Sequence, residues 1–494
     1  MKLYLKGHTE LYAVEQLQMQ LFPEEPTETV TAPFGSADGA VSTLSRGKTW
    51  LTATATVTWK GKTARASRRL PVSQAGDVRL RRRILQQSYF QAATAVLGVT
   101  PPWGALSGVR PTKLTTWHMQ AGGTEASADR MLRDVYFVTP ERRRLAVDCS
   151  RHTLEAASKL RPKDLSVYIG IPFCPTRCAY CSFVSQSIEK FGSYLEPYLE
   201  ALLKEITYTG QKLRESGWTI RSLYMGGGTP TTLDSRQMAR LMDAIGANFD
   251  LSQCLEFTVE GGRPDTLDYE KLRVIRQGGA DRMSINPQTM SDDVLQRIGR
   301  SHSVDQIFRA YDDAVRAGFE GINMDLIAGL PGDTPDSFAR SVSQVIGLNP
   351  TNITVHTLAL KKAAALFRQR PDLPSGEAVA RMLDDAEAQL RQTGYEPYYL
   401  YRQKYMSGSF ENVGWCKPGY TGYYNIYMME ELHTILSLGG GGMNKVNTGP
   451  NQLERFHNPK IPQDYISRID TILRQKDEIF DILNQQGSPC VSTD

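Results

Sequence analysis

The sequence has no long uncharged apolar run and no strong excess of either charge. Nowhere do about 18 uncharged apolar residues follow one another, so no membrane span is predicted. The start, Met1–Gly7, lacks the apolar stretch of a secretory signal, and we expect a cytoplasmic protein. The 57 Lys and Arg against 53 Asp and Glu give a net charge of +4. A net charge this close to zero does not attract nucleic acid or an anionic membrane to the protein as a whole. Neither partner is therefore expected.

Other compositional extremes are absent as well. With 40% hydrophobic and 22% charged residues the chain is not of a disordered type, and 41 Gly and 26 Pro are too few for a collagen-like or low-complexity protein. A length of 494 residues allows about two to four domains. We expect a monomer. Seven cysteines are too sparse for a disulfide scaffold, yet Cys174, Cys178 and Cys181 fall within eight residues.

Three parts with different patterns are predicted. Residues 1–162 are interpreted as an N-terminal α+β accessory domain, with a hairpin over 52–67 and a helix over 79–97. Residues 373–494 are interpreted as a mostly helical C-terminal domain that closes a substrate site, with helices over 375–393 and 461–486.

The middle part, residues 163–372, alternates short apolar strands with helical segments. Strands are expected at 166–171, 222–225, 256–260, 282–285, 321–326 and 352–356. Because a closed TIM barrel needs eight βα units, six of them predict an open, partial (β/α)6 barrel. The fold class is therefore α/β.

The three clustered cysteines follow the first barrel strand directly, where the active-site loops of βα barrels lie. Three thiolates in one tight loop can hold three irons of a 4Fe-4S cluster and leave the fourth iron open. Buried structural cysteines or a zinc site are the alternatives, but structural zinc normally takes four ligands and no second pair completes the set. The remaining cysteines have no such spacing and are expected to bind no metal: Cys149, Cys254, Cys416 and Cys490.

The cysteine spacing resembles the signature of the radical S-adenosylmethionine superfamily. The resemblance implies one 4Fe-4S cluster on Cys174, Cys178 and Cys181, with S-adenosylmethionine bound to its open iron. In that superfamily a glycine-rich edge after the second strand contacts the methionine amino group, because glycine lets the backbone approach a ligand. The residues at this place are Gly226, Gly227, Gly228 and Thr229.

The same resemblance assigns further cofactor contacts to the barrel strands and the segments after them. Tyr168 lies on the first strand, and Glu260 and Asp325 match acids that hold sugar hydroxyls. Gln288 and Arg300 match polar groups that bind the ribose and the carboxylate. Taken singly, Glu260 or Asp325 could instead be a capping or salt-bridged carboxylate.

The chemistry implied by the resemblance is radical chemistry. A reduced cluster passes one electron to S-adenosylmethionine, the C–S bond breaks and a 5′-deoxyadenosyl radical forms. The protein contributes orientation and a dry chamber. An external reductant of the flavodoxin or ferredoxin type is therefore an expected partner.

Several further segments resemble the oxygen-independent coproporphyrinogen III dehydrogenases (oxidases) of haem biosynthesis. They are 168–174, 226–230, 325–331 and 411–415, and the segments 108–114 and 398–404 resemble a longer branch of that family. The implied anaerobic reaction converts two propionates of coproporphyrinogen III to vinyls, giving protoporphyrinogen IX and passing electrons to an unidentified acceptor. Cations and aromatic rings for this tetrapyrrole are expected from Tyr399, Tyr401, Arg402, Lys404 and Trp415, unless these form an ordinary core.

Two features depart from the dehydrogenase pattern. Phe183 stands where the dehydrogenases have a fourth cysteine, and the related but shorter haem-chaperone branch also has Phe there. Haem binding and delivery is therefore one alternative function, and radical methylation or opening of a tetrapyrrole ring is another. The glycine run within 438–442 either closes over a second S-adenosylmethionine or the tetrapyrrole, or forms a simple tight turn.

Overall fold

A computed structural model describes residues 1–35, 38–106, 108–182, 185–361, 364–369, 372–403, 410–449 and 452–486. Phe183, Lys404 and Cys490, which were singled out in the sequence, lie outside these residues. The chain divides into two compact units, Met1–Val147 and Asp148–Asp494. In the described residues no helix is long and apolar enough to cross a membrane.

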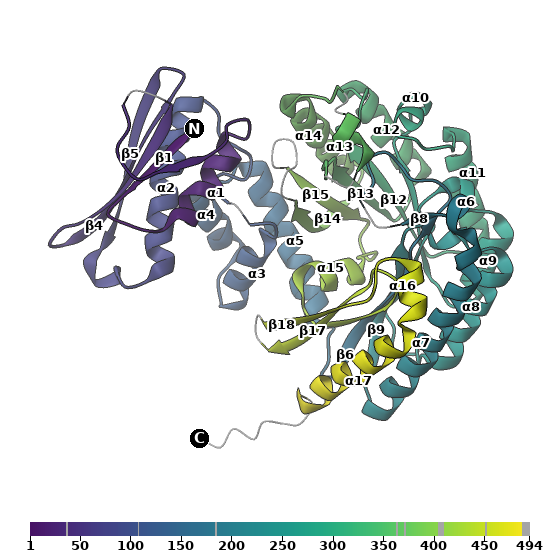
Figure 1. Ribbon diagram of the computed structural model, residues 1–494. Helices are drawn as coiled ribbons and strands as arrows, with labels where there is room; N and C mark the ends of the chain where they lie inside the picture. Colours follow the sequence, from purple (N-terminus) through teal and green to yellow (C-terminus); the bar gives the residue numbers. More distant parts are fainter. Residues whose placement is uncertain are drawn as a thin grey trace. The chain divides into compact units, whose positions relative to one another are not determined.

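The N-terminal unit is built on a five-stranded sheet with strand order β2-β1-β3-β4-β5 (Figure 1). Its strands are β1 (Lys2–Lys6), β2 (Glu28–Val30), β3 (Gly39–Arg46), β4 (Trp50–Trp59) and β5 (Lys62–Pro71). The predicted hairpin is confirmed as β4 and β5. Lys60 and Gly61 join these strands with φ values of 47° and 75°, the two-residue turn that matches strand twist.

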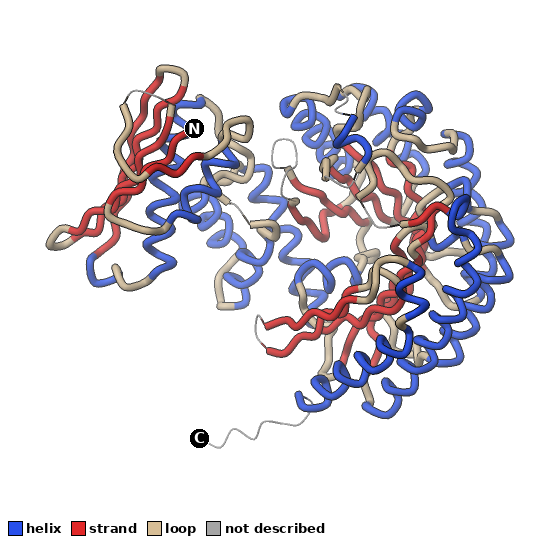
Figure 2. Tube along the Cα trace, in the orientation of Figure 1, coloured by secondary structure: helices blue, strands red, loops and turns tan. Residues whose placement is uncertain are grey.

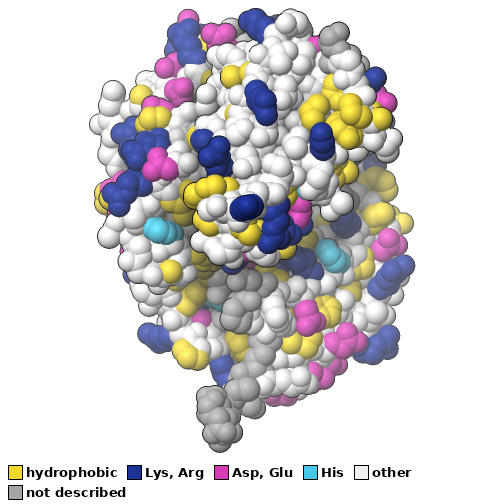
Figure 3. Space-filling model, turned by 90° about the vertical axis from the view of Figure 1, so that its left-hand side faces the viewer, with side chains coloured by type: hydrophobic (Ala, Val, Ile, Leu, Met, Phe, Trp, Pro, Cys, Tyr) yellow, Lys and Arg dark blue, Asp and Glu magenta, His cyan; other side chains and the backbone are white. Residues whose placement is uncertain are grey.

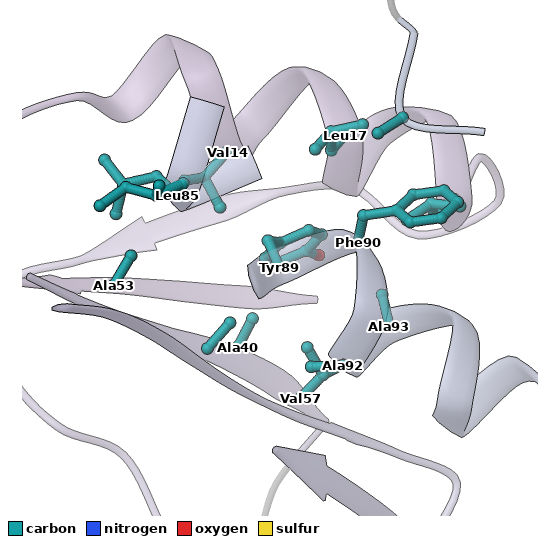
Figure 4. Packing of buried hydrophobic residues seen from close by; sticks show 14 of the residues in the cluster. Val14, Leu17, Ala40, Ala53, Val57, Leu85, Tyr89, Phe90, Ala92 and Ala93 are labelled. Carbon is teal, nitrogen blue, oxygen red and sulfur yellow. The ribbon is translucent and has the colours of Figure 1, made fainter. Parts of the chain in front are cut away.

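Helices α1 (Leu11–Leu21) and α2 (Val78–Leu97) pack on one face of this sheet, as Figure 4 shows. Alternation along β4 directs Ala53, Ala55 and Val57 into the core, where small side chains allow close approach of the helices. Tyr89 is fully buried there, and its hydroxyl donates to Gln18 Oε1 at 3.1 Å. Three more helices follow: α3 (Thr112–Gln120), α4 (Glu125–Tyr136) and α5 (Pro140–Ser158).

The second unit holds an eleven-stranded sheet, and its central strands are the six predicted ones. They run parallel in the order β6-β9-β10-β11-β12-β13 (Figure 2). Their bounds are β6 (Asp164–Ile171), β9 (Thr219–Gly227), β10 (Glu256–Glu260), β11 (Arg282–Gln288), β12 (Gly321–Ala328) and β13 (Asn352–Thr357). The partial barrel is thereby confirmed.

Helices cover the outside of the barrel strands (Figures 1 and 2). They are α7 (Leu195–Ser216), α8 (Ser235–Asn248), α9 (Tyr269–Gln277), α11 (Val304–Ala317), α12 (Pro335–Leu348) and α14 (Gly376–Gln392). A capping side chain fixes where most of them begin, because it accepts a hydrogen bond from a free backbone N–H of the first turn. The caps are Asp234, Asp268, Ser303, Thr334 and Ser375.

The C-terminal part differs from the mostly helical domain expected for 373–494. Its strands join the barrel sheet: β15 (Glu411–Cys416) pairs antiparallel with β13 and with β14 (Glu396–Arg402), and β16 (Thr434–Gly439) pairs parallel with β6. The hairpin β17 (Met443–Gly449) and β18 (Gln452–His457) extends the sheet beyond β16. The physical reason is that β14, although it is an edge strand of the sheet, buries aromatic side chains on both faces.

Helix α15 (Tyr423–Glu430) lies between β15 and β16 in the sequence, and α16 (Pro462–Ser467) and α17 (Ile469–Gln486) follow β18. Three shorter helices occur earlier: α6 (Ile188–Phe191) after the cysteine segment, α10 (Asp292–Arg297) after β11, and α13 (Ala365–Gln369) after β13. The sequence suggested boundaries near 162 and 372. The compact units divide at Val147 instead, and 373–494 shares a sheet with the barrel.

Candidate active site

The cysteine loop leaves the carboxyl end of β6 through the short strand β7 (Phe173–Cys174), which pairs with β8 (Gln186–Ser187). Cys178 is buried, and Cys174 and Cys181 are partly buried. Neighbouring strands hold the loop. The Ala179 amide donates to Ile298 O at 3.0 Å, and Arg263 Nη1 donates to Thr176 Oγ1 at 2.6 Å. The loop is therefore fixed by the segments that follow β10 and β11.

The glycine edge at the end of β9 lies directly against this loop. The Gly228 amide donates to Ile171 O at 2.8 Å, and the Thr229 amide donates to Phe173 O at 2.7 Å. A Cβ on Gly228 would stand 2.4 Å from Phe173 O, and a Cβ on Gly226 would stand 2.8 Å from Glu260 Oε2. At Gly228 a Cβ would meet backbone, so only glycine fits there, whereas at Gly226 it would meet side chains; the edge thus forms a cradle beside the cysteines.

Hydrogen bonds and a buried cation act on the thiols. Burial raises the pKa of Cys174, although the Thr229 hydroxyl, 3.5 Å from Cys174 Sγ, opposes that change. Arg300 is buried with Nη2 donating to the Tyr180 hydroxyl at 3.2 Å. Burial alone would lower the pKa of Arg300, but Tyr180 and Cys178 beside it raise the pKa overall. A buried guanidinium therefore lies beside Cys178 and Tyr180 in the cysteine loop.

Two carboxylates from adjacent strand ends face one interior region. Glu260 accepts from Asn286 Nδ2 at 3.2 Å and from the Tyr224 hydroxyl at 3.4 Å. Burial, and next the negative charge of Asp325, raise the pKa of Glu260 to about 7. At neutral pH this carboxyl group can therefore either accept or donate a hydrogen bond.

Asp325 has a different environment from Glu260. Burial alone would raise its pKa, but the His356 imidazole 3.5 Å away, together with Asn323 Nδ2 at 2.8 Å, lowers the pKa overall. Asp325 is thus the ionised member of the two. His356, on β13, is partly exposed beside it. No motif in the sequence pointed to His356, because its role arises from pairing between β12 and β13.

A stack of tyrosines lies beside these carboxylates. The Tyr224 ring lies 4.7 Å from Tyr424 and 6.3 Å from Tyr168, with interplanar angles of 18° and 10°. Tyr168 was predicted as a cofactor contact, whereas Tyr224 and Tyr424 were not singled out. Tyr424 comes from α15, far along the chain, so local sequence patterns could not place it in the stack.

Gln288 sits at an irregularity where the register between β11 and β12 shifts. Its φ is 70°, a left-handed conformation that is strained for a residue other than glycine. Its Oε1 is buried and accepts no hydrogen bond within the described residues. A strained backbone and an unsatisfied acceptor at a strand end indicate a site built for a ligand.

The donor set fits an iron–sulfur cluster better than a single ion. In the described part of the chain, no three His, Cys, Asp or Glu side chains converge where one metal ion could be held. A cubane cluster binds each thiolate to a different iron, so its ligands need not converge on one point. The residues that would hold the cluster are Cys174, Cys178 and Cys181, and the glycine cradle and Gln288 fit a cofactor beside it.

The residues expected to bind a tetrapyrrole are not brought together. Tyr399 and Tyr401 stack at 6.4 Å on the barrel side of β14, where the charge of Asp325 acts on both. Arg402 is one residue further, so alternation directs it to the opposite face, across from Glu411. Trp415 is buried under Arg391 of α14, whose guanidinium lies 5.4 Å from the ring. Arg402 and Trp415 therefore face the helices and not the carboxylates.

The glycine run forms the turn between β16 and β17. Gly439 and Gly441 have φ values of 82° and 76°, and the Gly440 amide donates to the Tyr198 hydroxyl at 2.7 Å. That hydroxyl donates to Gly170 O at 2.5 Å, at the end of β6. The run thus packs against the strand that leads into the cysteine loop.

The cysteine loop, the glycine cradle and the partial barrel together define a radical S-adenosylmethionine protein, and the model of the Radical SAM superfamily matches residues 168–345. This superfamily uses a 4Fe-4S cluster and S-adenosylmethionine. The chain is also 38% identical over 408 residues to the oxygen-independent coproporphyrinogen-III oxidase-like protein HemZ of Bacillus subtilis, which covers 81% of each protein. The chain belongs to this HemZ family of radical S-adenosylmethionine proteins.

Two more distant proteins are similar to part of this chain. The heme chaperone HemW of Bacillus subtilis is 32% identical over 58% of this chain and 73% of its own length. The structure of coproporphyrinogen III oxidase (HemN) from Escherichia coli superposes with a TM-score of 0.52 and 25% identity, over 65% of this chain and 72% of that one. The fold is therefore shared with an oxidase, and part of the sequence with chaperones.

Replacing Glu260 by Gln should change the pH dependence of stability. Because the folded-state pKa of about 7 lies above the ordinary value of 4.5, the native state holds the proton more tightly. The free energy of unfolding of the unliganded protein should therefore fall as pH rises through this window, by roughly 2 kcal/mol or less. Denaturant titrations at several pH values should show this fall in the wild type and a flatter profile in Glu260→Gln. If the wild type and Glu260→Gln gave the same pH profile, the buried environment assigned to Glu260 would be wrong.

Proposed function

We propose that the protein converts coproporphyrinogen III to protoporphyrinogen IX by oxygen-independent oxidative decarboxylation of two propionates, a step of haem biosynthesis. The observation that carries the proposal is the extent of the HemZ similarity, which takes in 81% of this chain. The HemW similarity takes in 58% of the chain. The shared fold with coproporphyrinogen III oxidase supports the same reaction.

When bound, the cofactor pair supplies a carbon radical that removes hydrogen from the substrate. The chain's own residues orient and enclose the reactants. Asp325, held ionised beside His356, is suited to accept hydrogen bonds from ribose hydroxyls, and Glu260 can do so with or without its proton. Arg300, whose buried Nε has no hydrogen-bond partner within the described residues, offers a donor to a carboxylate, and the glycine cradle allows close approach of the backbone to the methionine amino group. Fixed donors and acceptors of this kind would hold the bound reactants in one orientation.

The aromatic side chains of the barrel interior are suited to a flat macrocycle. Tyr168, Tyr224 and Tyr424 present stacked rings next to the carboxylates, and Tyr399 and Tyr401 add two more from β14. Rings packed in this way exclude water from the reaction. His356 is partly exposed beside Asp325 and offers a ring nitrogen for a hydrogen bond with a propionate.

The reaction also needs partners outside this chain. A reductant of the flavodoxin or ferredoxin type would supply the electron for the cluster, and a separate acceptor would take the electrons released from the substrate. Removal of hydrogen and loss of carbon dioxide leave one electron to be removed for each vinyl formed.

The test is anaerobic incubation of the reconstituted protein with dithionite, S-adenosylmethionine and coproporphyrinogen III, followed by mass analysis of the porphyrinogens. We expect a product lighter by two carbon dioxide molecules and four hydrogen atoms. A product heavier by a methyl group, or an opened ring, would establish a different radical reaction. Cleavage of S-adenosylmethionine with unchanged coproporphyrinogen would contradict the proposal.

Haem binding and delivery is the second candidate. It is supported by the HemW relatives, with identities of 27% to 32% in Escherichia coli and Bacillus subtilis, and by Phe183, which lies outside the described residues. Titration with haem, followed by visible absorbance, separates the two candidates. Stoichiometric haem binding without turnover of coproporphyrinogen would favour delivery, and turnover without haem binding would exclude it.

A further inference from the structure

The charged residues are distributed unevenly between the two units. Residues 1–147 contain 20 Lys and Arg against 11 Asp and Glu, a net charge of +9, so the total of +4 leaves −5 for residues 148–494. The total therefore gave no sign of a basic unit. The chemistry assigned to the barrel uses no residue of the N-terminal unit.

Among the described residues of the N-terminal unit, the helices that pack on the sheet lie on one of its two faces. The side chains packed against α1 and α2 come from that face, such as Leu3, Ala40 and Val57. Strand register places the alternate residues of the opposite face in rows across the sheet. One row runs Tyr4, Val41, Thr56 and Arg65, and the next runs Lys6, Thr43, Thr54 and Ser67. We call these rows and their neighbours the open face.

The open face combines hydroxyl groups with cations. Thr54 and Ser67 hydroxyls lie 2.9 Å apart, and Thr58 and Thr63 hydroxyls lie 3.0 Å apart. Within the described residues, the four cations of the face form no ion pair; they are Lys2, Lys6, Arg65 and Arg69. Figure 3 shows the side drawn at the left of Figure 1, where dark blue Lys and Arg side chains are interspersed with yellow hydrophobic and magenta acidic ones on a largely white surface.

Aromatic rings complete this surface. Trp50 begins β4 on the open face, with its side chain 44% exposed, and Tyr4 is partly exposed on β1. Glu28, on the edge strand β2 opposite Lys2, is the acidic residue in these rows. Unpaired cations attract phosphates, exposed rings stack on bases, and hydroxyl groups can pair with the ribose 2′-OH.

We propose that the open face of the N-terminal sheet binds single-stranded RNA. Phosphates would lie along Arg65, Arg69, Lys2 and Lys6, and unstacked bases would pack on Trp50 and Tyr4. An anionic membrane fits less well, because the face presents hydroxyl groups and not an apolar layer. An acidic protein would use the cations but would leave the exposed rings without a stacking partner. The proposal is independent of the reaction proposed for the barrel.

Fluorescence anisotropy of the full-length protein with a fluorescein-labelled oligouridine of about 12 nucleotides tests this surface. Four phosphate contacts predict a slope of about −3 for log affinity against log salt concentration. Arg65→Gln/Arg69→Gln should weaken binding about tenfold or more and reduce that slope by about 1.4. Trp50→Ala should weaken binding about fivefold or more.

The matched control is Arg79→Gln/Arg130→Gln, which removes the same charge from exposed helix positions of the same unit. The affinity of this control for the oligouridine should be within about twofold of that of the wild type. Binding depends on the cations of the open face and not on the net charge of the unit. Equal loss in both double variants would overturn the proposal. So would the absence of binding, equal affinity for single-stranded DNA, or equal competition by polyglutamate or anionic vesicles.

Discussion

Replacing any of Cys174, Cys178 and Cys181 by Ala should abolish both the visible iron–sulfur absorbance and the cleavage of S-adenosylmethionine. Each thiolate holds a different iron, so the loss of one leaves two ligands for a cluster that needs three from the protein. The loop itself should survive, because backbone bonds from Ala179 and the Arg263 contact to Thr176 hold it. Anaerobic reconstitution followed by iron and sulfide analysis measures the result.

Cys254→Ala is the matched control for this prediction. Its thiol is partly buried and donates to Glu256 O at 3.1 Å, away from the cysteine loop. The control should retain full cluster content and full cofactor cleavage. A cluster that persists in the triple variant would contradict the assignment of the iron ligands.

Gly228→Ala should produce the second largest effect. The new Cβ would stand 2.4 Å from Phe173 O, a backbone atom that cannot move without displacing the residue before Cys174. We expect the free energy of unfolding to fall by about 1–3 kcal/mol through overpacking. Displacement of the glycine edge relative to the cysteine loop should slow cofactor cleavage about a hundredfold. Denaturant titration and 5′-deoxyadenosine formation measure the two effects separately.

Gly246→Ala serves as the control for the glycine edge. Gly246 lies inside α8, and a Cβ there would meet nothing within 4 Å. Since Ala favours a helix over Gly, this variant should be more stable by about 0.5–1 kcal/mol with unchanged activity. If Gly228→Ala were likewise more stable and fully active, the close approach of Gly228 to Phe173 would not be required.

Much of the barrel could be predicted from sequence because its signals are local. All six expected strands are present, with ends that differ from the prediction by at most three residues, and β10 matches at both ends. The cysteine loop and the glycine edge follow the first two of them and meet through short backbone bonds. Parallel strands bring their carboxyl ends together, so motifs that follow strand ends become neighbours.

The residues that sequence reasoning missed depend on contacts between distant segments. His356, Tyr424 and Arg263 join the site through strand pairing, a late helix and a loop contact, and none belongs to a short motif. Arg402 and Trp415 were placed in the substrate group by residue type alone. Period-two alternation along β14 and β15 directs them to the helix-covered face instead.

The most direct test of the central claim uses coproporphyrinogen III labelled with deuterium at the propionate β-carbons. Under anaerobic reducing conditions, a radical formed in this barrel should remove that deuterium and carry it into 5′-deoxyadenosine, with protoporphyrinogen IX appearing in parallel. Mass analysis detects both products from one reaction. Formation of 5′-deoxyadenosine free of deuterium, with the porphyrinogen unchanged, would contradict the proposed reaction.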